Sequence, residues 1–136
     1  MITADSSVWI DYFNGQPTVQ TDLLDNLLDK SRDELVLLDL VLMEVMRGFR
    51  RDHELATAQR ILSCMPVVDA GGRALALEAA AHFRALRRVG ITVRSAIDLM
   101  VGAWCIANDV PLLHDDRDFA GMAEHRGLRV WSGFEP

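Results

Sequence analysis

The chain begins with the stretch MITADSS (residues 1–7), which places Asp5 directly after a short apolar run and follows it with two serines. The apolar run predicts a first strand over residues 2–5. Ser6 or Ser7 can then cap a short helix that continues to Phe13. A carboxylate at the end of a buried strand is costly to desolvate unless a partner compensates its charge. Asp5 is therefore the first candidate functional residue.

The rest of the chain alternates short apolar runs with segments of helical periodicity. Further strands are predicted over residues 35–38, 65–68, 110–113 and 128–131. Helices are predicted over residues 18–30, 39–49, 52–64, 73–89, 95–108 and 119–126, with Asp39 and Ser95 as N-caps. This alternation predicts an α/β fold, in which a central, mainly parallel sheet is covered on both faces and the site lies at the carboxyl ends of the strands.

Size, charge and cysteine content narrow the class of protein. The chain has 136 residues, of which 50% are hydrophobic, so we expect a single domain over residues 1–136. A net charge of −6 argues against a basic nucleic-acid binder, although carboxylates gathered around a metal would leave the remaining surface nearly balanced. Two isolated cysteines and the lack of a basic leader or a membrane-length apolar run favour a cytoplasmic protein with no membrane partner.

Four further acidic residues stand at comparable positions. Glu44 and Asp98 interrupt apolar helical segments and are expected in the first turns of their helices, while Asp116 and Asp118 follow the predicted strand 110–113. Carboxylates brought together repel one another unless something neutralises them. Mg²⁺ prefers hard oxygen ligands and retains several waters, so it needs few direct carboxylates. The pattern therefore predicts a divalent cation at one end of the sheet.

Four segments, in order along the chain, resemble the four motifs of PIN-domain nucleases. They are DSSVWI (residues 5–10), EVMRG (44–48), TVRSAID (92–98) and PLLHDDRDF (111–119). With the chain length, the set resembles the VapC toxins of prokaryotic VapBC toxin–antitoxin modules. The resemblance implies a three-layer α/β/α PIN-like domain. It also implies a metal-dependent endoribonuclease that uses Mg²⁺ or Mn²⁺ to cut RNA such as tRNA, rRNA or mRNA.

The same resemblance assigns roles to the acidic residues. Asp5, Glu44, Asp98 and Asp116 match the acidic quartet that binds the metal, and Asp118 matches a common fifth acid, so all five are candidate catalytic residues. We expect the first three to anchor one ion, whose bound water would have a lowered pKa and act as the nucleophile. The crowded residues 115–118 leave open whether Asp116 or Asp118 is the direct ligand, and whether one metal or two is bound.

Three residues beside these acids are candidate substrate contacts. Ser6 matches a position that is usually Thr or Ser in the family. Arg47 lies three residues after Glu44 on the same helical face, where it can orient that carboxylate or contact a phosphate. Arg94 precedes Asp98 in a loop near the predicted site, and arginine suits bidentate phosphate contacts.

Partners follow from the resemblance, and two other functions stay open. A VapB-type antitoxin is expected to block the acidic pocket and to carry all contacts with operator DNA, and a homodimer is expected. One alternative is a catalytically inactive PIN-like binding module. The other is a magnesium-dependent phosphotransfer domain, which normally needs a lysine late in the sheet. The only lysine, Lys30, lies early in the chain on a predicted amphipathic helix.

Overall fold

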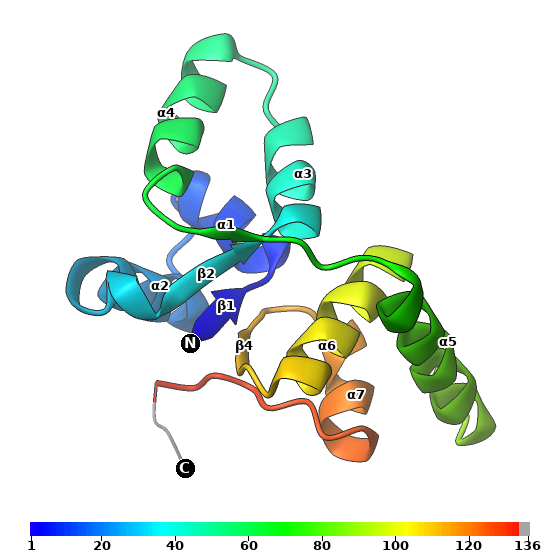
Figure 1. The fold of residues 1–136 in the computed structure, drawn as a ribbon. Coiled ribbons are helices and arrows are strands. Elements are labelled where there is room, and N and C mark those ends of the chain that lie inside the picture. Colours follow the sequence, from blue (N-terminus) through cyan, green and yellow to red (C-terminus); the bar gives the residue numbers. More distant parts are fainter. Residues whose placement is uncertain (134–136) are drawn as a thin grey trace.

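The computed structural model describes residues 1–133, and its centre is a sheet of four parallel strands (Figure 1). The strands stand in the order β3-β2-β1-β4. Their bounds are β1 (Ile2–Ala4), β2 (Leu35–Leu38), β3 (Val67–Val68) and β4 (Leu112–Leu113). The register pairs Ile2 with Leu35 and Thr3 with Leu112. The predicted parallel sheet is therefore confirmed.

Helices cover both faces of this sheet. They are α1 (Ser6–Phe13), α2 (Val19–Lys30), α3 (Asp39–Arg47), α4 (Asp52–Leu62), α5 (Arg73–Arg88), α6 (Ala96–Asn108) and α7 (Ala120–His125), with short 3-10 turns η1 (Arg32–Glu34) and η2 (Arg117–Phe119). Figure 1 shows α1 and α2 on one side of the strands, α5 to α7 on the other, and α3 and α4 projecting as a pair. The predicted three-layer α/β/α architecture is confirmed. Within residues 1–133, every helix is too short or too polar to cross a membrane.

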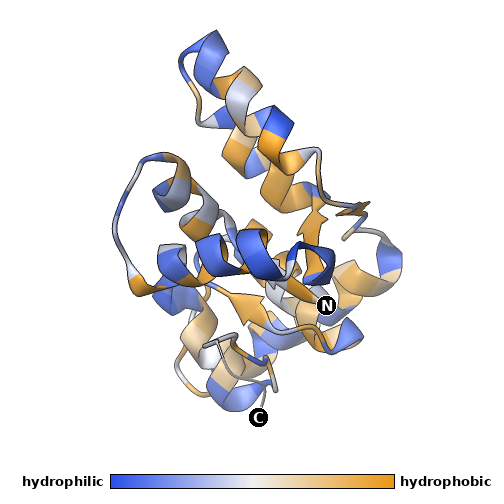
Figure 2. Ribbon diagram, turned by 90° about the vertical axis from the view of Figure 1, so that its left-hand side faces the viewer, coloured by the Kyte–Doolittle hydropathy of each residue, from blue (hydrophilic) through white to orange (hydrophobic). Residues whose placement is uncertain are grey.

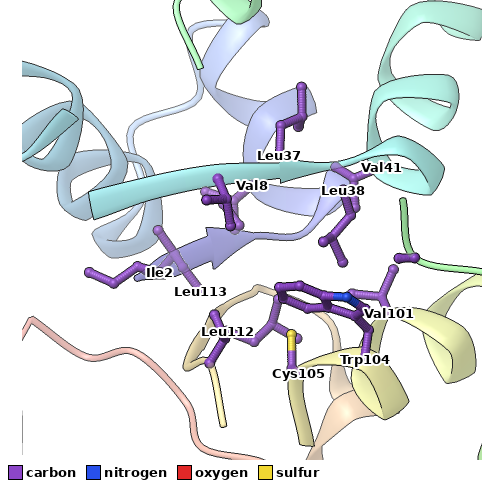
Figure 3. Packing of buried hydrophobic residues seen from close by; sticks show 14 of the residues in the cluster. Ile2, Val8, Leu37, Leu38, Val41, Val101, Trp104, Cys105, Leu112 and Leu113 are labelled. Atoms are coloured by element: carbon purple, nitrogen blue, oxygen red, sulfur yellow. The ribbon is translucent and has the colours of Figure 1, made fainter. Parts of the chain in front are cut away.

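The core forms where apolar strands meet the apolar faces of the helices. Leu35, Leu37 and Leu38 of β2 are fully buried, and Figure 2 shows the strands as almost entirely hydrophobic segments between helices with hydrophilic outer turns. In Figure 3, Trp104 and Cys105 project from α6 toward the strands. Each such buried side chain stabilises the fold by about 1.5–3 kcal/mol. This packing fixes α6, and with it Asp98, against the end of the sheet.

Three local predictions about helix caps have different outcomes. Ser95 caps α6 as predicted, because its side chain accepts a hydrogen bond from the Asp98 N–H. The helix α1 ends at Phe13 as predicted, but the prediction that Ser6 or Ser7 caps it was wrong: the N-cap is Asp5, and both serines lie inside the helix. Asp39 was also wrongly predicted as an N-cap. Its Oδ1 instead accepts hydrogen bonds from the N–H groups of Leu40 and Ala70, which joins the start of α3 to the chain after β3.

Several strands are shorter than predicted, and proline explains two of them. Pro66 and Pro111 have no N–H, so each contributes only a carbonyl to the neighbouring strand, accepting from Leu37 and Thr3 respectively. The last predicted strand, residues 128–131, was largely wrong. It forms a single parallel bridge between Leu112 and Val130, because β4 offers only two residues for pairing.

Candidate functional site

The strand order places the candidate site at a reversal in the sheet. From β1 the chain adds β2 and then β3 on one side, and it returns to place β4 on the other side of β1. Ligands of open parallel sheets bind at the carboxyl ends of the strands where such a reversal leaves a crevice. Asp5 follows β1, and residues 114–118 follow β4, so the two segments lie at the carboxyl edge of the sheet beside this reversal. The topology alone brings the first and last acidic segments together.

The five acidic residues form two overlapping groups. Asp5, Glu44 and Asp98 each offer one carboxylate oxygen, and these oxygens lie within 4.8 Å of one another. Asp98, Asp116 and Asp118 form a second group by the same measure. Asp98 belongs to both groups and joins them into one site. Thus all five candidate acids converge from four separate segments of the chain.

Asp5 is held between the end of β1 and the start of α1. Its side chain is 1% exposed, and its Oδ2 accepts a hydrogen bond of 3.1 Å from the Ser7 N–H. Burial raises the pKa of Asp5, and hydrogen bonds from Ser7 and the Ser6 N–H oppose that rise. The other oxygen, Oδ1, is buried without a hydrogen-bond partner within residues 1–133. A buried unpaired carboxylate oxygen is costly, and a cation would compensate it.

Glu44 reaches the site from α3. The Ser6 Oγ donates a hydrogen bond of 2.9 Å to its Oε1, and Arg47 lies 3.7 Å from its Oε2. Burial raises the pKa of Glu44, although it is less enclosed than Asp5. The prediction that it lies in the first turn was wrong, because α3 begins at Asp39 and Glu44 occupies the second turn. Because α3 begins directly after β2, the residue that reaches Asp5 and Asp98 lies in its second turn and not in its first.

Asp98 carries the most perturbed carboxylate of the site. It lies in the first turn of α6, as predicted, and is 6% exposed. Burial raises its pKa to about 7, and the charges of Asp5, Asp116 and Glu44 act in the same direction. Near neutral pH, Asp98 in the metal-free protein is thus partly protonated. A divalent cation would take the place of that proton.

Residues 114–118 form a loop fastened by its own backbone amides. The Asp116 N–H donates to His114 Nδ1 at 3.2 Å, and the Asp118 N–H donates to Asp116 Oδ1 at 2.9 Å. The Asp115 N–H donates to Ser7 Oγ at 3.2 Å, across 108 residues of sequence. His114 also packs on Phe119, with ring centroids 4.9 Å apart. Asp116 is therefore the N-cap of the short 3-10 helix η2, and Asp118 lies within that helix.

The three predicted substrate contacts differ in their exposure to solvent. Ser6 is buried and bonds to Glu44, while Arg47 and Arg94 are exposed. The sequence predicted only a possible capping role for Ser7. In the structure its hydroxyl accepts from the Asp115 N–H, and His114 accepts from the Asp116 N–H within the same loop. The position of Ser7 two residues after Asp5 was the one visible signal, and its distant partner could not be inferred from spacing.

The donor set suits a hard divalent cation. Within the part of the chain that the structure describes, both groups consist of carboxylates only. Oxygen donors of this kind favour Mg²⁺ or Mn²⁺ over softer metals. The unpaired, buried Oδ1 of Asp5 is an independent sign that a cation belongs here. Asp5, Glu44 and Asp98 would hold it, with Asp116 and Asp118 completing the site.

The parallel sheet with clustered carboxylates at its reversal point defines an α/β domain with an acidic site that could hold a cation. The PIN domain family model matches residues 2–125, and the chain belongs to this family. Curated relatives include a VapC ribonuclease of Mycobacterium bovis and ribonuclease VapC11 of Mycobacterium tuberculosis. Each is 28% identical over 132 residues, which cover 97% of this chain and 98% of the relative.

Solved structures give the same fold. VapBC2 from Rickettsia felis, bound to a DNA fragment from its promoter, superposes with a TM-score of 0.73 and covers 96% of this chain and 98% of that one. DNA-bound VapBC from Salmonella typhimurium gives a TM-score of 0.72 with the same coverage. Both are 16% identical to this chain, so the similarity concerns the fold.

Proposed function

We propose that this protein is a metal-dependent endoribonuclease that acts as the toxin of a type II toxin–antitoxin module. The observation that carries the proposal is the pair of carboxylate groups that share Asp98, beside the unpaired buried oxygen of Asp5. The curated relatives are named as VapC ribonucleases, and the neighbours in structure are VapBC assemblies, which supports the same conclusion.

The residues of the site divide into those that hold the ion and those that contact RNA. Asp5, Glu44, Asp98 and Asp116 are the proposed ligands of Mg²⁺ or Mn²⁺, and Asp118 is a fifth catalytic acid. When bound, the ion lowers the pKa of a coordinated water and offsets the charge of the phosphodiester.

The chain's own side chains then position these groups. Ser6 holds Glu44 in place through its 2.9 Å hydrogen bond. The exposed side chains of Arg47 and Arg94 contact phosphates of the RNA. A tRNA, an rRNA or an mRNA is the substrate class.

The partner follows from the charge of the pocket and of the chain. A VapB-type antitoxin inhibits the protein by placing a basic side chain among the carboxylates, where a charge-assisted bidentate contact with arginine is favourable. Because the chain has a net charge of −6, contacts with operator DNA are made by the antitoxin and not by this protein. The protein acts in the cytoplasm as a homodimer of the single domain formed by residues 1–136.

Cleavage of an end-labelled RNA by the purified protein tests the proposal. We expect cleavage in Mg²⁺ or Mn²⁺, its loss in EDTA, and its loss in Asp5→Asn. The matched control Asp29→Asn removes an exposed carboxylate from α2 and should cleave as the wild type does. Equal activity of Asp5→Asn and the wild type would contradict the proposal, because the cleavage would then not depend on the acidic site.

The same preparation separates the two alternatives. A catalytically inactive binding module would leave RNA intact in either metal. A phosphotransfer domain would instead form a hydroxylamine-sensitive acyl-phosphate when incubated with labelled acetyl phosphate. We expect RNA cleavage and no labelling.

A further inference from the structure

Ser7 makes contacts that connect the two ends of the site. Its backbone N–H donates to Asp5 Oδ2 at 3.1 Å, and its hydroxyl also forms a hydrogen bond with the Asp5 carboxylate that lowers the pKa of Asp5. Its Oγ accepts from the Asp115 N–H at 3.2 Å. The contacts with Asp5 orient the carboxylate at the end of β1. The contact with Asp115 fastens the loop after β4 to the first turn of α1. Ser7 thus contacts both Asp5 and the loop that carries Asp116 and Asp118.

The loop that Ser7 fastens carries the second half of the site. Asp116 and Asp118 lie one and three residues beyond Asp115, and a hydrogen bond of 2.9 Å from the Asp118 N–H to Asp116 Oδ1 fixes their mutual arrangement. Moving this loop therefore moves both carboxylates together. These two carboxylates form the second acidic group together with Asp98. Asp98 also belongs to the first group, with Asp5 and Glu44. The spacing between the two carboxylate groups therefore depends on the position of this loop.

We propose that Ser7 is a positioning residue, whose hydroxyl holds the 114–118 loop against the Asp5 end of the site and so sets the spacing of the two carboxylate groups. This inference rests on the proposed metal-dependent function. Hydrogen-bonded groups behind metal ligands commonly alter metal affinity by about 10–100-fold when removed. Ser7 does not touch the ion or the RNA in this assignment, since its contacts are with Asp5 and the loop backbone.

Three variants separate the hydroxyl from the shape of the side chain. Ser7→Ala removes the acceptor, Ser7→Thr retains it, and Ser7→Val has the shape of threonine without the hydroxyl. We expect Ser7→Ala and Ser7→Val to bind Mn²⁺ about 10-fold more weakly than the wild type in calorimetric titration, and Ser7→Thr to restore binding. In metal-free protein, amide hydrogen exchange at Asp115 should become faster in the two variants without the hydroxyl.

A matched control removes a helix-capping hydroxyl far from the acids. Thr18 caps α2 and accepts from the Thr21 N–H at 3.0 Å. Thr18→Ala should lower the melting temperature in EDTA and leave Mn²⁺ affinity unchanged. The positioning role is contradicted if Ser7→Val binds Mn²⁺ as Ser7→Thr does, or if affinity merely follows the melting temperature across all variants. If the wild type binds no Mn²⁺, the proposed function fails and this inference fails with it. If the wild type binds Mn²⁺ and the Ser7 variants bind it with the same affinity, the inference alone fails.

Discussion

The Ser6 hydroxyl donates a hydrogen bond of 2.9 Å to Glu44 Oε1, joining α1 to α3 across 38 residues of sequence. Through this contact one oxygen of the Glu44 carboxylate is held beside Asp5 and Asp98, while the other oxygen lies 3.7 Å from the exposed Arg47. A hydroxyl that donates to a buried carboxylate leaves that carboxylate negatively charged and still able to accept a cation. The structure therefore gives Ser6 a second role besides the substrate contact predicted from the sequence.

Replacing Ser6 tests this role. Hydrogen bonds to charged groups contribute about 1.5–3 kcal/mol, so Ser6→Ala should weaken Mn²⁺ binding by about 10-fold or more. Ser6→Thr keeps the hydroxyl and should bind nearly as well as the wild type. Calorimetric titration with Mn²⁺ measures both. Equal affinities of the alanine and threonine variants would show that the hydroxyl does not position Glu44.

Removing the shared carboxylate should separate activity from stability. Asp98→Asn eliminates a negative charge that four neighbouring acids repel, and Asp98 is 6% exposed. We expect the variant to lose RNA cleavage by at least about 100-fold and yet to melt at a higher temperature than the wild type in EDTA at pH 8. Thermal unfolding followed by circular dichroism tests the second part. A lower melting temperature would mean that Asp98 has a stabilising contact other than the proposed ion.

The metal-free protein should become less stable as pH rises from about 4 to 7. The pKa of Asp98 is raised from 3.8 to about 7 in the folded state, so between these values the folded state binds the proton more strongly than the unfolded state does. The stabilisation from that proton is complete below pH 4 and is lost as pH rises through 7. The raised pKa values of Asp5 and Glu44 act with the same sign.

Denaturant unfolding in EDTA across this pH range measures the effect. Saturating Mg²⁺ should reverse it, because the ion binds the deprotonated carboxylates and its affinity increases until Asp98 has ionised. Asp98→Asn provides the control, since its stability should change less with pH. A free energy of unfolding that rises with pH in EDTA would contradict the assigned shift.

Asp5 and Asp98 could be predicted from the sequence because each lies at a boundary that the apolar pattern reveals, whereas Glu44 lies within α3 and was indicated by its motif. Asp5 ends a strand and Asp98 follows a capping serine, so local pattern and motif order were sufficient to place them. Ser7 was missed as a link because its partner, Asp115, is 108 residues away, and no spacing rule encodes that contact.

Asp39 shows a second kind of limit. An aspartate after a strand fits an N-cap and a tether to a neighbouring loop equally well, since both use the same carboxylate oxygens as acceptors. Only the position of Ala70 decides between them.

That tether has a measurable consequence for stability. The Ala70 N–H donates to Asp39 Oδ1 at 3.0 Å, and Ala70 is completely buried. Asp39→Ala leaves this amide without its acceptor and should destabilise the protein by about 1–3 kcal/mol. Asp39→Asn keeps an oxygen acceptor and should lose much less. Urea unfolding of the two variants in EDTA compares them without any contribution from metal. If both variants lost the same stability, the negative charge of Asp39 near the start of α3, rather than its hydrogen bond to Ala70, would be the stabilising feature.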